Sequence, residues 1–232
     1  MASFIDDTTG LPHASYDLWE RKFLTTTYST AVTYQALLVA ADFATLFEYP
    51  DDQVGWQKAA EQITANEQVF FDPERGTLRN GYLLAEDDSL QFDNTLDVSS
   101  IYGVMTYGLF SDSSSVLHES VKKIEAELLG QNKSGGTPRF EDDEYFRRDA
   151  NSKGNPWIVT TLWVAQHYIK CQRPEEASNL IDWALSHAMP SGALSEQIDP
   201  ESSEQLSVAP LVWSHAEMIN TLLDLNNFQK SQ

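Results

Sequence analysis

Three acidic residues stand in settings that could support acid and base chemistry. Asp17 and Glu20 lie in the stretch SYDLWERK, and Glu196 lies in GALSEQID near the other end of the chain. Two carboxyl groups that face each other across a cavity can hydrolyse a glycosidic bond, because one protonates the departing oxygen while the other activates a water molecule. Trp19 could exclude water from its neighbour Glu20. The alternative is that all three are solvated surface carboxylates, as most of the 35 acidic residues must be.

Three longer strings surround these acids. TGLPHASYDLWER, GNPWIVTTLWVAQHYI and GALSEQIDPESSEQLSVAPLVWSHAEMI occur in this order and together reach across nearly the whole chain. In these strings the sequence resembles glycoside hydrolase family 15, the glucoamylases and their bacterial relatives. The resemblance implies an all-α fold of the (α/α)6-toroid type, with Glu20 as general acid and Glu196 as general base. It also implies inversion at the anomeric carbon and release of β-glucose from the non-reducing ends of α-1,4- or α-1,6-linked glucans.

The same resemblance implies sugar-binding roles for five further residues. They are the acid's neighbours Asp17 and Trp19, then Arg139 in PRFEDD, Trp157 in GNPW and Trp213 in LVWSHAE. Arg139 would bind sugar hydroxyls, although Phe140 replaces the Tyr that usually follows it in the family. Either Asp142 or Asp143 would belong to the same loop. The last two tryptophans could equally be packing residues.

Two departures from the family leave alternatives open. Arg21 follows the acid where relatives often carry a second acidic residue, so the preferred linkage could differ, and an enzyme that acts on trehalose fits the motifs as well. The family barrel has about twelve helices, whereas the helical patterns here number only about seven. The second hypothesis is therefore a non-catalytic or split piece that needs an N-terminal half, a copy of itself or another partner.

Composition narrows the partners and cofactors. The net charge of −20 argues against nucleic acid and membrane partners and leaves an α-glucan or oligosaccharide as the expected ligand. The histidines lack the spacing of a metal site, so we expect neither metal nor cofactor. Cys171 is the only cysteine and is expected to pack at the end of a helix. The start MASFIDDTTGLPH has no signal-peptide pattern, which predicts a cytoplasmic location unless the chain is a fragment.

The elements that must position the acids follow from hydrophobic periodicity. Four segments are apolar on most faces, which predicts buried helices over 24–47, 95–110, 156–171 and 209–228. Three segments with one apolar stripe alternate with them and predict outer helices over 53–70, 114–129 and 174–188. The alternation favours one partial α/α toroid over residues 1–232, although an irregular helical bundle is the other interpretation.

Helix starts and loops complete the prediction. Asn155 as N-cap and Pro156 in the first turn would begin the third buried helix. Residues 72–93 resist helix assignment and predict a long loop with a small hairpin. The loops 6–23, 130–155 and 189–208 each lead into a buried helix, so in a toroid they would meet at one end of the ring, where Glu20 and Glu196 would lie.

Overall fold

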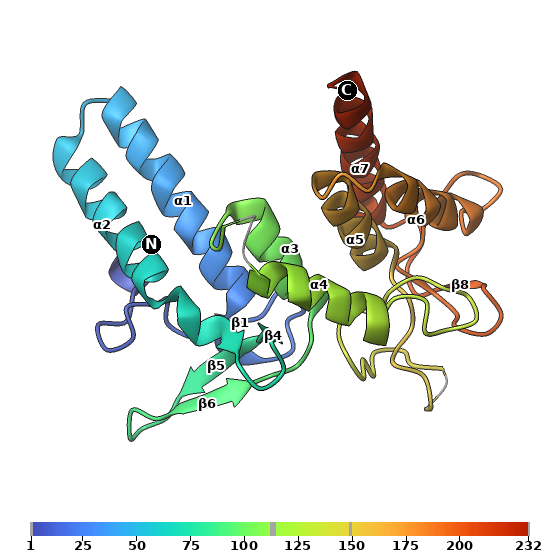
Figure 1. The fold of residues 1–232 in the computed structure, drawn as a ribbon, viewed down its shortest axis with the longest axis horizontal. Helices are drawn as coiled ribbons and strands as arrows, with labels where there is room; N and C mark the ends of the chain where they lie inside the picture. The colour runs from blue at the N-terminus through green and yellow to red at the C-terminus, as the bar shows by residue number, and fades with distance from the viewer. Residues whose placement is uncertain (1, 112–114, 149, 232) are drawn as a thin grey trace. The chain divides into compact units, whose positions relative to one another are not determined.

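The computed structural model describes residues 2–111, 115–148 and 150–231, which form seven α-helices and three small sheets (Figure 1). The chain divides into two compact units, Met1–Ser120 and Val121–Gln232. The division falls within α4, Ser115–Glu127. The expectation of one domain over 1–232 stays a prediction. None of the helices in these described ranges has the length and apolar character needed to cross a membrane.

The first unit is built on a helical hairpin. The long helix α1, Thr27–Leu46, packs against α2, Pro50–Asn66, and against α3, Val98–Tyr107 (Figure 1). Thr26 is the N-cap of α1, because its side chain accepts the backbone N–H of Ser29 at 2.9 Å. The expected helix over 24–47 therefore begins three residues too early.

A four-stranded antiparallel sheet includes the residues directly before α1. Its strands, in spatial order, are β1 Ser15–Tyr16, β2 Phe23–Thr26, β5 Gly81–Leu84 and β6 Leu90–Asp93. The hairpin of β5 and β6 confirms the hairpin expected within 72–93, and β3, Phe71–Asp72, pairs with β4, Thr77–Leu78, just before it. The short loop between β1 and β2 contains Glu20, so the sheet is what holds the expected acid in place.

The second unit surrounds one buried helix. The helix α5, Ile158–Lys170, packs against α6, Pro174–Ser186, and α7, Val212–Lys230. Its residues Ile158 and Leu162 join side chains of α6, α7, β7 and the loop before β7 in one apolar core: Ile181, Ala184, Leu194, Ile198 and Met218. A two-stranded ribbon of β7, Gln197–Ile198, and β8, Gln205–Leu206, follows α6, and residue 196 directly precedes it.

The start of α5 differs from the prediction. The helix begins at Ile158 and its N-cap is Trp157, so the expected N-cap Asn155 and first-turn Pro156 lie before it. The side chain of Asn155 bonds within the loops instead: its oxygen, the atom that a cap would use, accepts the N–H of Arg148 at 3.4 Å, and its NH₂ group donates to the carbonyl oxygen of Phe146 and the side chain of Gln197.

Burial of the helices follows the prediction only in part. The helices α3 and α5 are buried, and the stripe of α4 is confirmed at Leu117, Val121, Ile124 and Leu128, although residue 114 lies outside the described residues. The helices α1 and α7 are not buried on all faces. Their large apolar side chains Val39, Phe43, Ile219 and Leu223 are exposed, because their packing partners α2, α3 and α5 cover only other faces. Cys171, expected to pack, is also exposed.

Candidate active site

The turn between β1 and β2 carries the expected acid and is closed mainly by Asp17. The N–H of Asp17 donates to the carbonyl of Lys22 at 2.8 Å, and its own carbonyl accepts the N–H of Glu20 at 3.0 Å. Its buried carboxylate accepts the N–H of Arg21 at 2.7 Å. These bonds hold Glu20 at φ +54°, in the left-handed region that non-glycine residues seldom occupy. The exposed carboxyl of Glu20 is thus presented by a strained backbone that the turn enforces.

A lysine ties the far end of this turn to the sheet. The Lys22 ammonium pairs with the carboxylate of Asp93 at the end of β6, and it donates to the hydroxyl of Thr95 at 3.3 Å. The same Asp93 carboxylate accepts the amide of Asn80 at 2.9 Å. The turn that carries Glu20 is therefore fastened to the end of β6, at the far edge of the same sheet.

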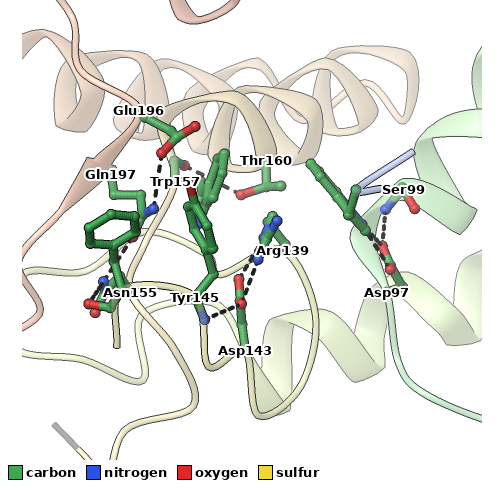
Figure 2. Close-up of polar contacts among 12 residues, drawn as sticks. Asp97, Ser99, Arg139, Asp143, Tyr145, Asn155, Trp157, Thr160, Glu196 and Gln197 are labelled. Atoms are coloured by element: carbon green, nitrogen blue, oxygen red, sulfur yellow. Dashed lines mark hydrogen bonds and ion pairs between the residues drawn. The ribbon is translucent and has the colours of Figure 1, made fainter. Parts of the chain in front are cut away.

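Trp19 is anchored by a residue that sequence reasoning missed. Its indole N–H donates to both carboxylate oxygens of Asp97, at 3.2 and 3.0 Å. Asp97 is the N-cap of α3 and also accepts the N–H of Ser99 at 2.7 Å (Figure 2). Burial raises the pKa of Asp97 to about 6, against the lowering effect of these hydrogen bonds. An Asp before a helical pattern signals an N-cap, but nothing local indicates the bond to Trp19.

The expected base Glu196 lies where the second unit's loops meet the start of α5. Its N–H donates to the carbonyl of Val208 at 3.0 Å, and its carbonyl accepts the N–H of Ile158 at 3.3 Å. Its carboxylate Oε2 accepts the side-chain amide of Gln197 at 3.1 Å (Figure 2). The backbone and one carboxylate oxygen of Glu196 are thus both fixed.

Gln197 is itself oriented by Asn155, and both side chains are buried. The Asn155 amide donates to Gln197 Oε1 at 2.8 Å and to the carbonyl of Phe146 at 2.9 Å (Figure 2). Because Oε1 faces a donor, the NH₂ end of Gln197 must face Glu196. Local sequence gives no signal for this role of Gln197, and the predicted N-cap role of Asn155 is wrong.

Arg139 lies in a buried aromatic setting and is paired with Asp143. Its Nε and an Nη donate to the two Asp143 oxygens at 2.7 and 2.8 Å. Its guanidinium carbon lies 4.6 Å from the ring centre of Trp157, 4.9 Å from that of Tyr145 and 5.1 Å from that of Phe140. The structure therefore brings Arg139 and Trp157 together, as Figure 2 shows.

The same geometry decides between the two candidate aspartates. Asp143 is buried with Arg139, whereas the side chain of Asp142 is 66% exposed and lies 3.7 Å from the ammonium of Lys153. Tyr145 was not among the expected site residues, although its ring is half exposed and lies 6.0 Å from that of Trp157. The only local signal for it was an aromatic residue in the polar loop.

Trp213 lies at the start of α7. It is in the first turn of α7, half buried, with its ring edge-to-face against Trp163 of α5 at 5.6 Å. Two residues further along α7, the imidazole of His215 accepts the N–H of Leu194 at 3.0 Å. The second unit thus brings together Glu196, Arg139 and Trp157, and the first brings together Asp17, Trp19 and Glu20. The separation of Glu20 and Glu196 stays a prediction.

Known proteins resemble this chain over nearly its whole length. It is 26% identical over 214 residues to an uncharacterized glycosyl hydrolase of Methanocaldococcus jannaschii, covering 87% of this chain and 32% of the relative. It is 27% identical over 154 residues to trehalase 1 of Sulfolobus acidocaldarius, covering 65% of this chain and 25% of that protein. The structure of a bacterial glucoamylase complexed with acarbose matches 98% of this chain and 37% of its own, with a TM-score of 0.79 at 17% identity.

These matches settle the fold and the family. The likeness to the glucoamylase structure confirms paired helices of the (α/α)6-toroid type, here an incomplete barrel. The chain spans about a quarter to a third of the length of the relatives named. The family model described as "Glycosyl hydrolases family 15" matches residues 9–181 and 172–223. The chain therefore belongs to glycosyl hydrolases family 15.

Proposed function

We propose that this chain supplies the catalytic residues of an inverting, glucoamylase-like glucoside hydrolase. Glu20 donates a proton to the glycosidic oxygen, and Glu196 takes a proton from the water that attacks the opposite face of the sugar. Inversion requires that the two carboxyl groups stand about 6.5–9.5 Å apart, to leave room for that water. The product is β-glucose from the non-reducing end of an α-1,4- or α-1,6-linked chain.

The observation that carries this proposal is the fixed orientation of Glu196. Gln197 holds Oε2, and among the described residues no hydrogen bond engages Oε1, so one oxygen is positioned to accept a proton from water. A buried relay through Gln197 to Asn155 gives this carboxylate a defined geometry, which general base catalysis needs. Glu20, at a strained and exposed turn tip, has the accessibility that a proton donor to a sugar oxygen needs.

Trehalose is the second candidate substrate, because a trehalase is among the relatives that match the chain. The two substrates share the acid and base chemistry and differ in what holds the leaving sugar. Arg21, next to Glu20, is the residue of this chain that we expect to affect that choice.

Proton NMR of sugar anomers tests the proposal. The chain, alone and with any neighbouring sequence its gene encodes, is incubated with maltotriose, isomaltose and trehalose. We expect β-glucose to appear first from maltotriose. Glu20→Gln and Glu196→Gln should each lower turnover by about 10³-fold or more. Initial α-glucose from maltotriose, or no hydrolysis by any form of the wild-type protein, would overturn the assignment.

Two glutamates serve as matched controls. Glu48→Gln changes an exposed glutamate that also has a positive φ, at +61°, and Glu201→Gln changes an exposed glutamate in the loop that follows Glu196. Both should retain wild-type turnover. If the control variants lose as much activity as the Glu20 and Glu196 variants, a general loss of charge or structure explains the effect. The catalytic roles of Glu20 and Glu196 would then be wrong.

A further inference from the structure

We propose that Asp97 is a positioning residue for the acid, which holds the indole of Trp19 and thereby fixes the turn that presents Glu20. The inference rests on the proposed role of Glu20 as general acid. Asp97 lies far from Glu20 in sequence and outside the three strings on which the family resemblance was based, so the assignment comes from contacts within the first unit. It makes Asp97 part of the machinery without direct contact to the sugar.

The first argument is that Asp97 makes more contacts than a helix cap needs. An N-cap requires a single acceptor oxygen, which Oδ1 provides to the N–H of Ser99 at 2.7 Å. The second oxygen, Oδ2, accepts the indole N–H of Trp19 at 3.0 Å, and Oδ1 shares that donor at 3.2 Å. A serine or threonine cap would satisfy α3 but would offer no second oxygen to the indole.

The second argument is that burial of the Asp97 carboxylate costs free energy. Asp97 is 3% exposed, and no ion pair is found for it within the described ranges of the chain. Burial and the nearby charge of Asp17 raise its pKa to about 6, despite the hydrogen bonds from Ser99 and Trp19. A buried, unpaired carboxylate destabilises a fold unless it serves a specific contact, and here that contact is the indole.

The third argument is that the Glu20 turn needs an outside anchor. Glu20 occupies a left-handed conformation that is unfavourable for a residue with a Cβ, so surrounding contacts must enforce it. Asp17 and Lys22 tie the two ends of the turn. Trp19 lies directly before Glu20, and its indole fixes the middle. Fixing Trp19 fixes the peptide bond that joins it to Glu20. It thereby fixes the direction in which the Glu20 side chain leaves the backbone.

Leaving-group dependence separates positioning from a structural role. Maltose needs protonation of its leaving oxygen, whereas fluoride leaves α-glucosyl fluoride without help from an acid. We expect Asp97→Asn and Asp97→Leu to lower kcat for maltose by about ten-fold or more and to change kcat for the fluoride by less than about three-fold. Trp19→Phe, which keeps an aromatic ring but removes the donor, should lower kcat for maltose more than kcat for the fluoride. The double variant Trp19→Phe/Asp97→Asn should lose no more than the worse single variant.

Asp72→Asn is the matched control. Asp72 is equally buried in the same unit and likewise accepts the N–H of the residue two positions on, at 3.0 Å, but its carboxylate is not bonded to an indole. This variant should change both substrates alike or not at all. Equal losses on the two substrates by the Asp97 variants, or losses that multiply in the double variant, would overturn the proposal.

A spectroscopic measurement on the full chain tests the contact without any substrate. The Trp19 indole signal in a ¹H–¹⁵N spectrum is assigned by its absence in Trp19→Phe. It should shift in Asp97→Asn and stay in place in Asp72→Asn; an unmoved signal in Asp97→Asn would refute the contact. If the wild type hydrolyses neither maltose nor the fluoride while the indole responds as expected, the proposed function fails and the contact survives. If the wild type is active and the indole is unmoved, the Asp97 inference fails alone.

Discussion

Replacement of Asp143 by Asn tests whether the Arg139 loop is held by a buried ion pair. The side chains of Arg139 and Asp143 are only 6% and 1% exposed, and two hydrogen bonds of 2.7 and 2.8 Å join them. Asn keeps the shape of Asp but turns one acceptor into a donor and removes the charge that faces the guanidinium. Breaking such a pair from one side destabilises a protein by about 3–5 kcal/mol, because a charge stays buried without compensation.

The neighbouring residue offers a matched control. Asp142→Asn also removes one negative charge, but its partner Lys153 lies 3.7 Å away and both side chains are about half exposed or more. Exposed pairs contribute about 0–1 kcal/mol. Asn also tolerates the φ of +59° that Asp142 adopts, so no new backbone strain arises.

Urea unfolding followed by circular dichroism measures both variants. We expect Asp143→Asn to lower the free energy of unfolding by about 3–5 kcal/mol, a large part of the 5–15 kcal/mol typical of a domain. Asp142→Asn should stay within about 0.5 kcal/mol of wild type, with a difference that vanishes in high salt. If Asp143→Asn stays within about 1 kcal/mol of wild type, or if the two variants lose equally, the buried pair is not what holds the loop.

Three further predictions follow from the same structure. Asn155→Ala removes the donor that orients Gln197, so kcat for a glucoside should fall about ten-fold or more with KM nearly unchanged; an equal rise in KM would contradict a role in orienting Glu196. Gly136→Ala places a Cβ 2.7 Å from Trp183 Cη2 and 2.8 Å from Pro156 Cβ, so it should lower the melting temperature more than Gly130→Ala, which meets nothing within 4 Å at a similar positive φ. Asp97 binds its proton more tightly in the folded protein, with a pKa of about 6 against 3.8, so its contribution to stability is fully present below pH 3.8 and is lost as pH rises through 6. Measured against Asp97→Asn, wild type should lose roughly 2 kcal/mol between pH 4 and pH 7, which is most of the full difference at 1.36 kcal/mol per pKa unit, and a difference that does not change with pH would contradict the raised pKa.

Several features were readable from the sequence because they depend on local patterns. The helices α3 and α5 and the stripe of α4 follow from hydrophobic periodicity, and the family follows from three strings in order. Helix boundaries were less certain. No Gly or Pro separates residues 24–26 from the helix they precede, yet β5 and β1 pair with β2, and the β5 pairing depends on residues far along the chain.

Other features depended on which groups meet in space. Asn155 before Pro156 fits an N-cap by local rules, but the helix begins only at Ile158, and the NH₂ group of Asn155 donates to Gln197 from another loop. Asp142 and Asp143 are chemically identical in sequence, and only burial beside Arg139 separates them. Asp97 is recognisable as a helix cap, whereas its second partner, the indole of Trp19, comes from a turn in a different part of the chain.

The sequence by itself determined the helical class, the family and the identity of the two candidate glutamates, because periodicity and short motifs are written in neighbouring residues. Only the tertiary structure decided what orients them: Asp97 behind Trp19, and Asn155 behind Gln197. The physical reason is that hydrogen bonds and burial join residues distant in sequence. A polar side chain's partner is set by where the folded backbone places it, and local sequence carries no record of that position.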